Sequence, residues 1–185
     1  GVQIILSVSQ RQQLLALFLL TKREPFILAQ LETITQVSRM TILKDVNEVD
    51  EWLHEQNLRL IRKPHFGVLI SGAEHDCQQA LTKLLWGETP FSSEPITEIT
   101  HSDGLMFTLQ RDAQLLPLVE YVNEYFSILH IQRAISLVAK AEEQFGGRFT
   151  DDAVLHLALV FSVMSNRIQG GNLLEVDDKL ITSLQ

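Results

Sequence analysis

The first part of the chain carries apolar residues at helical spacing. Residues 9–21 are polar at first and apolar at most later positions, which predicts a mostly buried helix with a polar start. Pro25 disfavours helix at Glu24, so this helix is expected to stop within residues 22–25. Residues 26–34 predict a short second helix, and a tight connection follows it.

A third helix is expected from Ser38, whose hydroxyl can cap it, to about Asn57. One stripe at i, i+4, i+7 and i+11 predicts its buried face: Ile42, Val46, Val49 and Leu53. Its charges divide by position, with basic residues in the first half and acidic residues in the second: Arg39 and Lys44, then Glu48, Asp50 and Glu51. This division raises the question of whether the basic end faces a nucleic acid.

A β-hairpin is predicted after the third helix. Residues 58–62 and 68–71 are two short runs of β-type residues, and Pro64 and Gly67 lie in the turn between them. Residues 73–86 then predict a helix that leaves the hairpin. Three helices followed by a hairpin are typical of a winged helix-turn-helix, with the hairpin as the wing.

The stretch from residue 87 to 104 predicts a linker or surface loop. It contains two Pro, three Ser and four acidic residues, and no helical spacing. We place the linker at residues 87–111, between a winged helix-turn-helix domain at 1–86 and a helical segment at 112–185.

The helical segment is predicted to hold several helices. Residues 115–126 and 127–145 form two helices or one broken one, which ends at Gly146 and Gly147. Thr150 is expected to cap a helix that runs to about residue 169 and carries acidic residues in its first turn. Residues 174–184 predict a last helix. The predicted fold class is therefore mainly α.

Net charge differs between the two parts. The chain as a whole carries −8, but residues 1–73 hold eight Lys and Arg against seven Asp and Glu, which gives +1. Residues 74–185 hold seven against sixteen, which gives −9. The acidic total argues against nucleic-acid binding over the whole surface, and the asymmetry indicates two modules with different partners.

Other features exclude several classes of protein. A single cysteine, Cys77, excludes a disulfide framework and a multi-cysteine zinc site, and it fits a reducing compartment. The longest apolar run, residues 153–164, is too short to cross a bilayer, so we expect a cytoplasmic protein without membrane contact. No phosphate-binding glycine loop, nucleophile motif or metal-ligand spacing is present, so we expect no enzyme, no metal and no cofactor.

Two sequence blocks resemble a known family of bacterial regulators. "SQRQQLLALFLL" and "VSRMTILKDVNEVDEWLHEQNLRLIRKPHFGVLISG" resemble a Mga-like helix-turn-helix, over about residues 9–86. "FTDDAVLHLALVFSVMSNRIQGGN" resembles the centre of a phosphotransferase-system (PTS) regulation domain, over about residues 112–185. Together they resemble transcription regulators of the BglG and mannitol-operon-activator type. The match to the regulation domain stops before that domain is complete.

The resemblance implies a DNA-binding activator of a sugar-uptake operon. Its partners would be operator DNA and phosphotransferase-system proteins, which would phosphorylate histidines in the helical part, and it would act as a homodimer. In the family pattern a histidine stands seven residues before an arginine. Counting back from Arg167 gives Val160, whereas the "HLAL" motif selects His156, so the phospho-acceptor is either lost or shifted by one helical turn. His130 is a second candidate, expected on a helix.

Residues in the third helix and the wing are the candidates for DNA contact: Ser38, Arg39, Thr41, Lys44, Arg62 and Lys63. Residues at the N-terminus of a recognition helix meet base edges, and the wing meets phosphates. The acidic second half of the helix would then point away from the duplex. The alternative is an interaction or dimerisation module in which these charges are a solvated surface.

Overall fold

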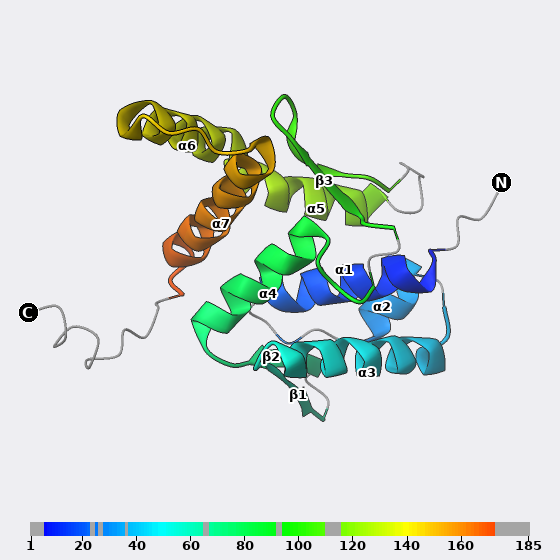
Figure 1. The fold of residues 1–185 in the computed structure, drawn as a ribbon. Helices are drawn as coiled ribbons and strands as arrows, with labels where there is room; N and C mark the ends of the chain where they lie inside the picture. Colours follow the sequence, from blue (N-terminus) through cyan, green and yellow to red (C-terminus); the bar gives the residue numbers. More distant parts are fainter. Residues whose placement is uncertain are drawn as a thin grey trace, which may run out of the picture.

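The computed structural model describes residues 6–22, 25, 28–35, 37–64, 67–91, 94–109 and 116–172. The fold is mainly α, with two small antiparallel hairpins (Figure 1). The elements in chain order are α1 (Val8–Thr21), α2 (Leu28–Thr35), α3 (Arg39–Glu55), β1 (Arg59–Lys63), β2 (Gly67–Ser71), α4 (Glu74–Trp86), β3 (Thr97–Thr100), β4 (Gly104–Phe107), α5 (Leu116–Ile128), α6 (Ile131–Phe145) and α7 (Asp151–Gln169). The predicted helix at residues 174–184 lies outside the described residues.

The first helix is buried along most of its length, as predicted. Residues 14–20 of α1 are all buried, and the helix packs on α3 and α4. It begins one residue earlier than expected, because Ser7 and Gln10 form a reciprocal capping box. The helix is therefore central to the fold, with other helices on several sides (Figure 1).

The predicted apolar stripe of α3 is confirmed. All four residues are at most 2% exposed: Ile42, Val46, Val49 and Leu53. Ser38 caps the helix by accepting a hydrogen bond from the Thr41 amide at 3.3 Å. Burial of one face sets how α3 is rotated about its axis, so the opposite face is presented to solvent.

The hairpin after α3 is also confirmed, within one residue at each strand end. β1 and β2 pair antiparallel, with Arg59 opposite Ser71 and Lys63 opposite Gly67. The chain leaves α3 through Asn57, which adopts a left-handed conformation (φ 59°). α4 then begins after Ala73 and ends at Gly87, whose left-handed φ of 85° suits a glycine C-cap.

The prediction of an irregular stretch at residues 87–104 is wrong in its second half. Residues 97–107 contain the antiparallel hairpin β3–β4. Gln13 of α1, 1% exposed, holds the approach to β3, because its amide donates to the Glu94 carbonyl at 2.9 Å and accepts from the Ile96 amide at 3.1 Å. Phe91 packs edge-on against Trp52, with ring centroids 5.6 Å apart. The described part of this segment is therefore packed onto α1 and α3.

The break between α5 and α6 falls later than predicted. The sequence placed it after residue 126, but α5 continues to Ile128 and α6 begins at Ile131. His130 lies in the break with a left-handed φ of 53°, so its predicted position on a helix is wrong. The ends of α6 and α7 agree with prediction, since Gly146 terminates α6 and Thr150 caps α7 by accepting from the Ala153 amide.

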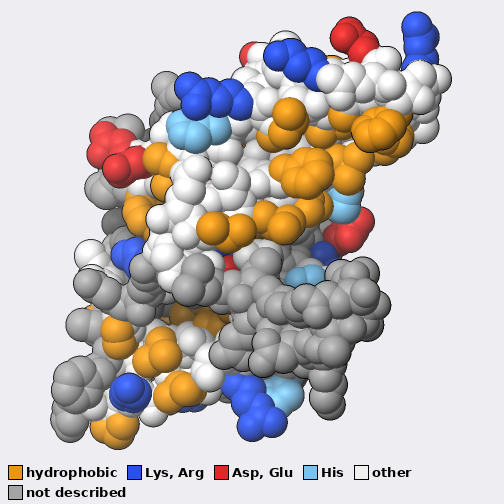
Figure 2. All heavy atoms as spheres, turned by 90° about the vertical axis from the view of Figure 1, so that its left-hand side faces the viewer, with side chains coloured by type: hydrophobic (Ala, Val, Ile, Leu, Met, Phe, Trp, Pro, Cys, Tyr) orange, Lys and Arg blue, Asp and Glu red, His pale blue; other side chains and the backbone are white. Residues whose placement is uncertain are grey.

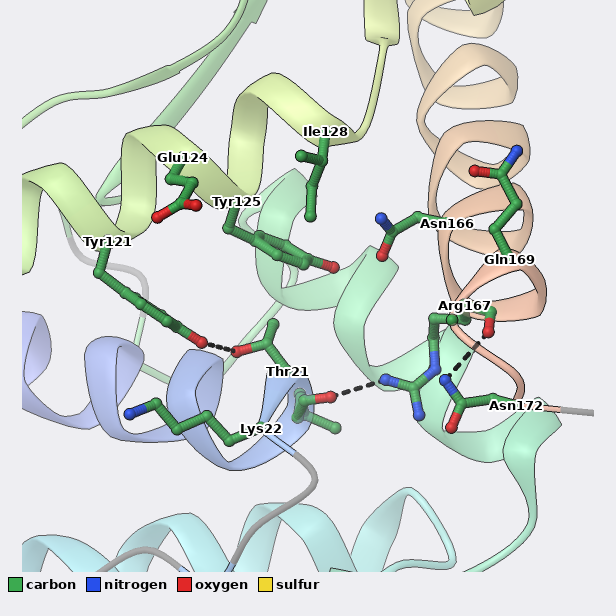
Figure 3. Close-up of a pocket in the computed structure, with 12 residues that line it drawn as sticks. Thr21, Lys22, Tyr121, Glu124, Tyr125, Ile128, Asn166, Arg167, Gln169 and Asn172 are labelled. Atoms are coloured by element: carbon green, nitrogen blue, oxygen red, sulfur yellow. Dashed lines mark hydrogen bonds between the residues drawn. The ribbon is translucent and has the colours of Figure 1, made fainter.

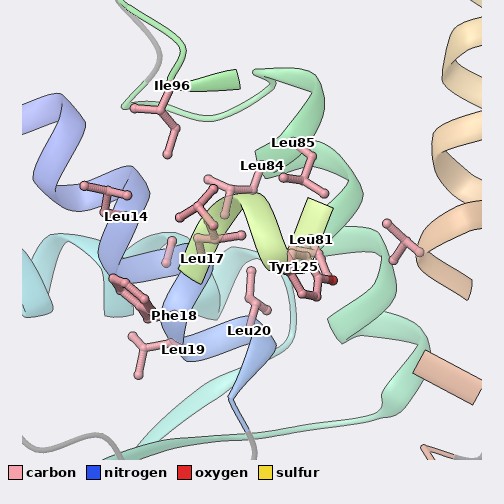
Figure 4. Packing of buried hydrophobic residues seen from close by; sticks show 14 of the residues in the cluster. Leu14, Leu17, Phe18, Leu19, Leu20, Leu81, Leu84, Leu85, Ile96 and Tyr125 are labelled. Carbon is pink, nitrogen blue, oxygen red and sulfur yellow. The ribbon is translucent and has the colours of Figure 1, made fainter. Parts of the chain in front are cut away.

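Helices from the two predicted parts share one hydrophobic core. Leucines of α1 and α4 pack against each other, and Tyr125 of α5 enters the same cluster (Figure 4). α7 packs against both α4 and α6. The division into domains remains a prediction, but any boundary near residue 87 has to accommodate these contacts.

Hydrophobic side chains are exposed on the face formed by α6 and α7 (Figure 2). The exposed fractions reach 60% for Leu137, 84% for Phe145 and 46% for Phe161. No helix within the described ranges is both long and apolar enough to span a bilayer.

Candidate nucleic-acid interface

The N-terminus of α3 is exposed and ordered by its own side chains. The Ser38 and Thr41 hydroxyls lie 3.0 Å apart, and Ser38 also caps the helix. Arg39 is exposed, and its guanidinium lies 3.5 Å from the Glu32 carboxylate of α2. Met40 is 75% exposed. An exposed ion pair of this kind contributes little stability, so Arg39 can exchange it for another anion at small cost.

Lys44 lies one turn further along the same helix and is exposed. The acidic residues Glu48 and Glu51 are exposed as well. They follow Lys44 by four and seven residues, so they share its face of the helix. The basic and acidic side chains are therefore separated along the helix axis, and they do not lie on opposite faces of the helix. Asp50 differs from both, because it accepts a hydrogen bond from the Leu60 amide of β1 at 3.4 Å.

A side-chain contact joins the β1–β2 hairpin to α3, in addition to the hydrogen bond between the Leu60 amide and Asp50. The Arg62 guanidinium donates to the Asn47 side-chain oxygen at 2.6 Å. Arg59 and Lys63 are exposed on the same strand. The structure thus joins Arg62 to the middle of α3, whereas no contact brings Lys63 to the helix among the described residues. Arg62 adds a positive charge beside the acidic half.

A buried ion pair fixes α3 in place, and the sequence reasoning missed it. Arg11 of α1 and Asp45 of α3 are 7% and 2% exposed, and their closest nitrogen and oxygen lie 2.8 Å apart. The Arg11 guanidinium also donates to the Leu6 carbonyl at 2.9 Å. Asp45 lies next to Val46, at the edge of the apolar stripe of α3. An acidic residue on a buried helix face indicates a paired charge, and this was the signal available in the sequence.

His156, the candidate phospho-acceptor on α7, lines the same cavity as Val160, the position at which an acceptor would have been lost. His156 and Val160 both face a cavity of about 500 Å³ between α4 and α7, together with His75 and Lys83. The His156 ring is half-buried and lies edge-on to Trp86, with centroids 5.0 Å apart. The inference that the two positions share one face is therefore confirmed. Arg167, seven residues after Val160, forms an ion pair with Glu74 of α4.

His130, the second candidate, is exposed at the junction of α5 and α6. Its side chain caps no backbone amide, and it lines two shallow hollows that it shares with Arg133. An exposed histidine is accessible to another protein, whereas His156 is half-buried in the wall of the cavity.

The described residues contain no cluster of three or more His, Cys, Asp or Glu that could hold a metal ion. Cys77 is buried in α4, and this burial raises the pKa of its thiol. A buried thiol with a raised pKa is a weak nucleophile.

No protein-family model matches the sequence, and no curated protein is significantly similar to it.

Proposed function

We propose that this chain is part of a winged helix-turn-helix transcription regulator that binds operator DNA through the N-terminus of α3. The observation that carries the proposal is the exposed, capped start of α3, with Arg39 and Lys44 on it and the β1–β2 hairpin held beside it by Arg62. The order of α1, α2, α3, the hairpin and α4 supports this proposal, because a winged helix-turn-helix is expected to place its elements in this order.

The residues have separate roles in this proposal. Arg39 reads guanine or phosphate, Thr41 contacts a thymine methyl or phosphate, and Lys44 contacts phosphate. The Ser38 end of the helix presents backbone amides to phosphate. Arg62 and Lys63 on the wing contact the flanking backbone. Four basic groups at most reach phosphates, so one protomer binds with a salt slope of roughly −3 to −4.

We further propose that the regulator is a homodimer. Four basic contacts are few for operator affinity, and a second copy doubles them. The exposed apolar side chains of α6 and α7, above all Leu137 and Phe145, are a suitable surface for that contact. The same surface favours the alternative function, an interaction module that does not bind DNA.

The experiment for DNA binding is selection of duplexes from a randomised pool, followed by gel shift with the variant Arg39→Ala/Lys44→Ala. The expected result is a loss of affinity and a salt slope about 2 units shallower, because two phosphate contacts are removed. The matched control is Lys140→Ala/Arg148→Ala, which removes the same charge from exposed positions outside α3 and the wing. Sedimentation velocity checks that the oligomer is unchanged.

Two results would overturn the DNA-binding proposal. One is a pool in which no duplex is enriched by the native chain. The other is equal loss of affinity in the Arg39/Lys44 variant and the control. Either result, combined with an intact dimer, leaves the interaction module as the better description.

We also propose that the phosphotransferase system regulates this protein by phosphorylating His156, with His130 as the second candidate acceptor. The test is incubation with phosphoenolpyruvate, the general phosphotransferase proteins and a sugar-specific component, followed by mapping of acid-labile phosphate. Phosphate that disappears in His156→Ala but persists in His130→Ala supports the first site. No phosphate on either histidine indicates that the acceptor has been replaced by Val160.

A further inference from the structure

A second cavity, of about 540 Å³, lies where the end of α1 meets α5 and the end of α7 (Figure 3). Its volume is in the range of sites that hold small organic ligands. It is separate from the α3 surface and from the cavity that contains His156. Its walls come from both parts of the chain, because Thr21 and Lys22 end α1 whereas Tyr125 and Asn166 belong to α5 and α7.

The cavity has aromatic walls that are held in position. The Tyr121 hydroxyl lies 3.0 Å from the Thr21 hydroxyl, which fixes that ring against α1. The Tyr121 ring lies 5.0 Å from Phe18, and the Lys22 ammonium lies 5.1 Å from the centre of the Tyr121 ring. These contacts restrain the Tyr121 ring, which lowers the entropic cost of packing a ligand against it.

Polar groups without protein partners face the same space. Tyr125 is 9% exposed, and its hydroxyl makes no hydrogen bond within the described part of the chain. Figure 3 shows this hydroxyl directed toward the side of the cavity where Asn166 and Arg167 lie. The Asn166 side-chain amide likewise has no partner among the described residues. Glu124 and Gln169 also line the cavity, and the Gln169 amide nitrogen donates to the Ser165 hydroxyl at 3.4 Å. The Tyr125 hydroxyl is accessible from the cavity, so it is available to form a hydrogen bond with a ligand there.

The charged group at the base of the cavity is already neutralised. Arg167 donates to both carboxylate oxygens of Glu74, one of them at 2.8 Å, and to the Leu20 carbonyl at 2.7 Å. Its guanidinium is therefore part of the wall and does not act as a free cation. The groups left for a ligand are the Tyr125 phenol, the Asn166 carboxamide, the Glu124 carboxylate and the oxygen of the Gln169 carboxamide, which supply donors and acceptors together.

We propose that this cavity binds a small polyhydroxylated molecule of monosaccharide size. Hydroxyl groups both donate and accept, as do the Asn166 amide and the Tyr125 phenol. The tyrosine rings provide flat apolar walls on which the C–H face of such a molecule packs. Lys22, at the mouth, is positioned to distinguish a phosphorylated from an unphosphorylated form. The proposal is independent of DNA binding, since it concerns other residues.

The experiment is isothermal titration of the full chain with hexoses, hexitols, their 6-phosphates and inorganic phosphate. The expected result is binding of one polyhydroxylated compound at a ratio of one per chain. Tyr125→Phe and Asn166→Ala are expected to weaken that binding by tenfold or more. Gln79→Ala, on the rim of the other cavity, is the control and leaves it unchanged. Lys22→Ala is expected to weaken the binding of the 6-phosphates and to leave the binding of the unphosphorylated compounds unchanged.

Tyr125→Phe also separates a binding role from a structural one. It keeps the ring in the core and removes only the unpaired hydroxyl, so thermal unfolding without ligand is expected to be unchanged or shifted slightly upward. Three results would overturn the proposal: no compound of the panel binds at millimolar concentration, inorganic phosphate binds as well as the sugars, or Tyr125→Phe and Asn166→Ala bind like the native chain.

Discussion

Two arginine–carboxylate pairs hold the helices together, and they differ in what they join. Arg11 and Asp45 connect α1 to α3 within the first 86 residues, and both side chains are below 10% exposed. Arg167 and Glu74 connect α7 to α4, and both side chains are 12% exposed. The first pair sets the position of the candidate recognition helix. The second ties the later helices to the earlier ones, because Arg167 also binds the carbonyl at Leu20 of α1.

The second pair therefore couples the two parts of the chain through α1 and α4. The pKa of Arg167 shows the same balance: burial by itself lowers it, but the hydrogen bonds and charge of Glu74 outweigh burial and the pKa is raised. A ligand in the cavity between α1, α5 and α7 would lie beside this pair. Substitutions at the two pairs should therefore have distinct effects.

The largest effect is expected from Asp45→Ala. This change leaves the Arg11 charge buried without its partner, so the free energy of unfolding should fall by about 3–5 kcal/mol. Urea denaturation measures it, with Glu48→Ala as the exposed control that changes stability by less than about 0.5 kcal/mol. A loss in Asp45→Ala as small as in the control would show that the pair is not buried in solution.

A smaller effect is expected from Glu74→Ala, at about 1.5–3 kcal/mol, because the charge-assisted hydrogen bonds to Arg167 are lost from a partly exposed site. Asp76→Ala is the matched control, since both acids lie in the first turn of α4 and interact equally with the helix dipole. Hydrogen exchange should become faster in α7 and stay unchanged in α3. Equal acceleration in both helices would contradict separate roles for the two pairs.

The smallest effect concerns alkaline pH and is absent at neutrality. The chain's two tyrosines, Tyr121 and Tyr125, both lie in α5, and burial raises both pKa values above the ordinary value of 10. The pKa of each tyrosine is therefore higher in the folded than in the unfolded chain. The free energy of unfolding is at its full value below pH 10 and falls as the pH rises toward the pKa of the folded state. Urea midpoints should therefore fall above pH 10, and less so in Tyr121→Phe/Tyr125→Phe. An identical fall in the double variant would assign the effect to other groups.

Local patterns predicted much of the fold. The stripe of α3, the caps Ser38 and Thr150, and the stop at Gly146 depend on residues within about two helical turns, and each agrees with the structure. The sequence does not predict the second hairpin, because the proline and serine content of residues 87–104 indicates an irregular stretch. The β-branched residues Thr97, Ile99 and Thr100 were the overlooked signal.

The candidate sites were predictable only in part. The basic start of α3 is visible in the sequence, because Arg39 and Lys44 stand beside a clear N-cap. The Arg62 contact with Asn47 spans 15 residues and depends on where the hairpin docks. The cavity lined by Tyr125 could not be predicted from the sequence. Its walls come from α1, α5 and α7, and the space between them depends on how these distant helices pack.

Neighbouring residues are enough to predict which segments are helical, where most helices begin and end, and which face of α3 is buried. These properties follow from side-chain periodicity and capping between neighbouring residues. The burial and pairing of charges depend instead on contacts between distant segments. Arg11 meets Asp45 across 34 residues, and Arg167 meets Glu74 across 93. Whether a charge is solvated or paired depends on the helix packed over it, and that helix is supplied by a distant part of the chain.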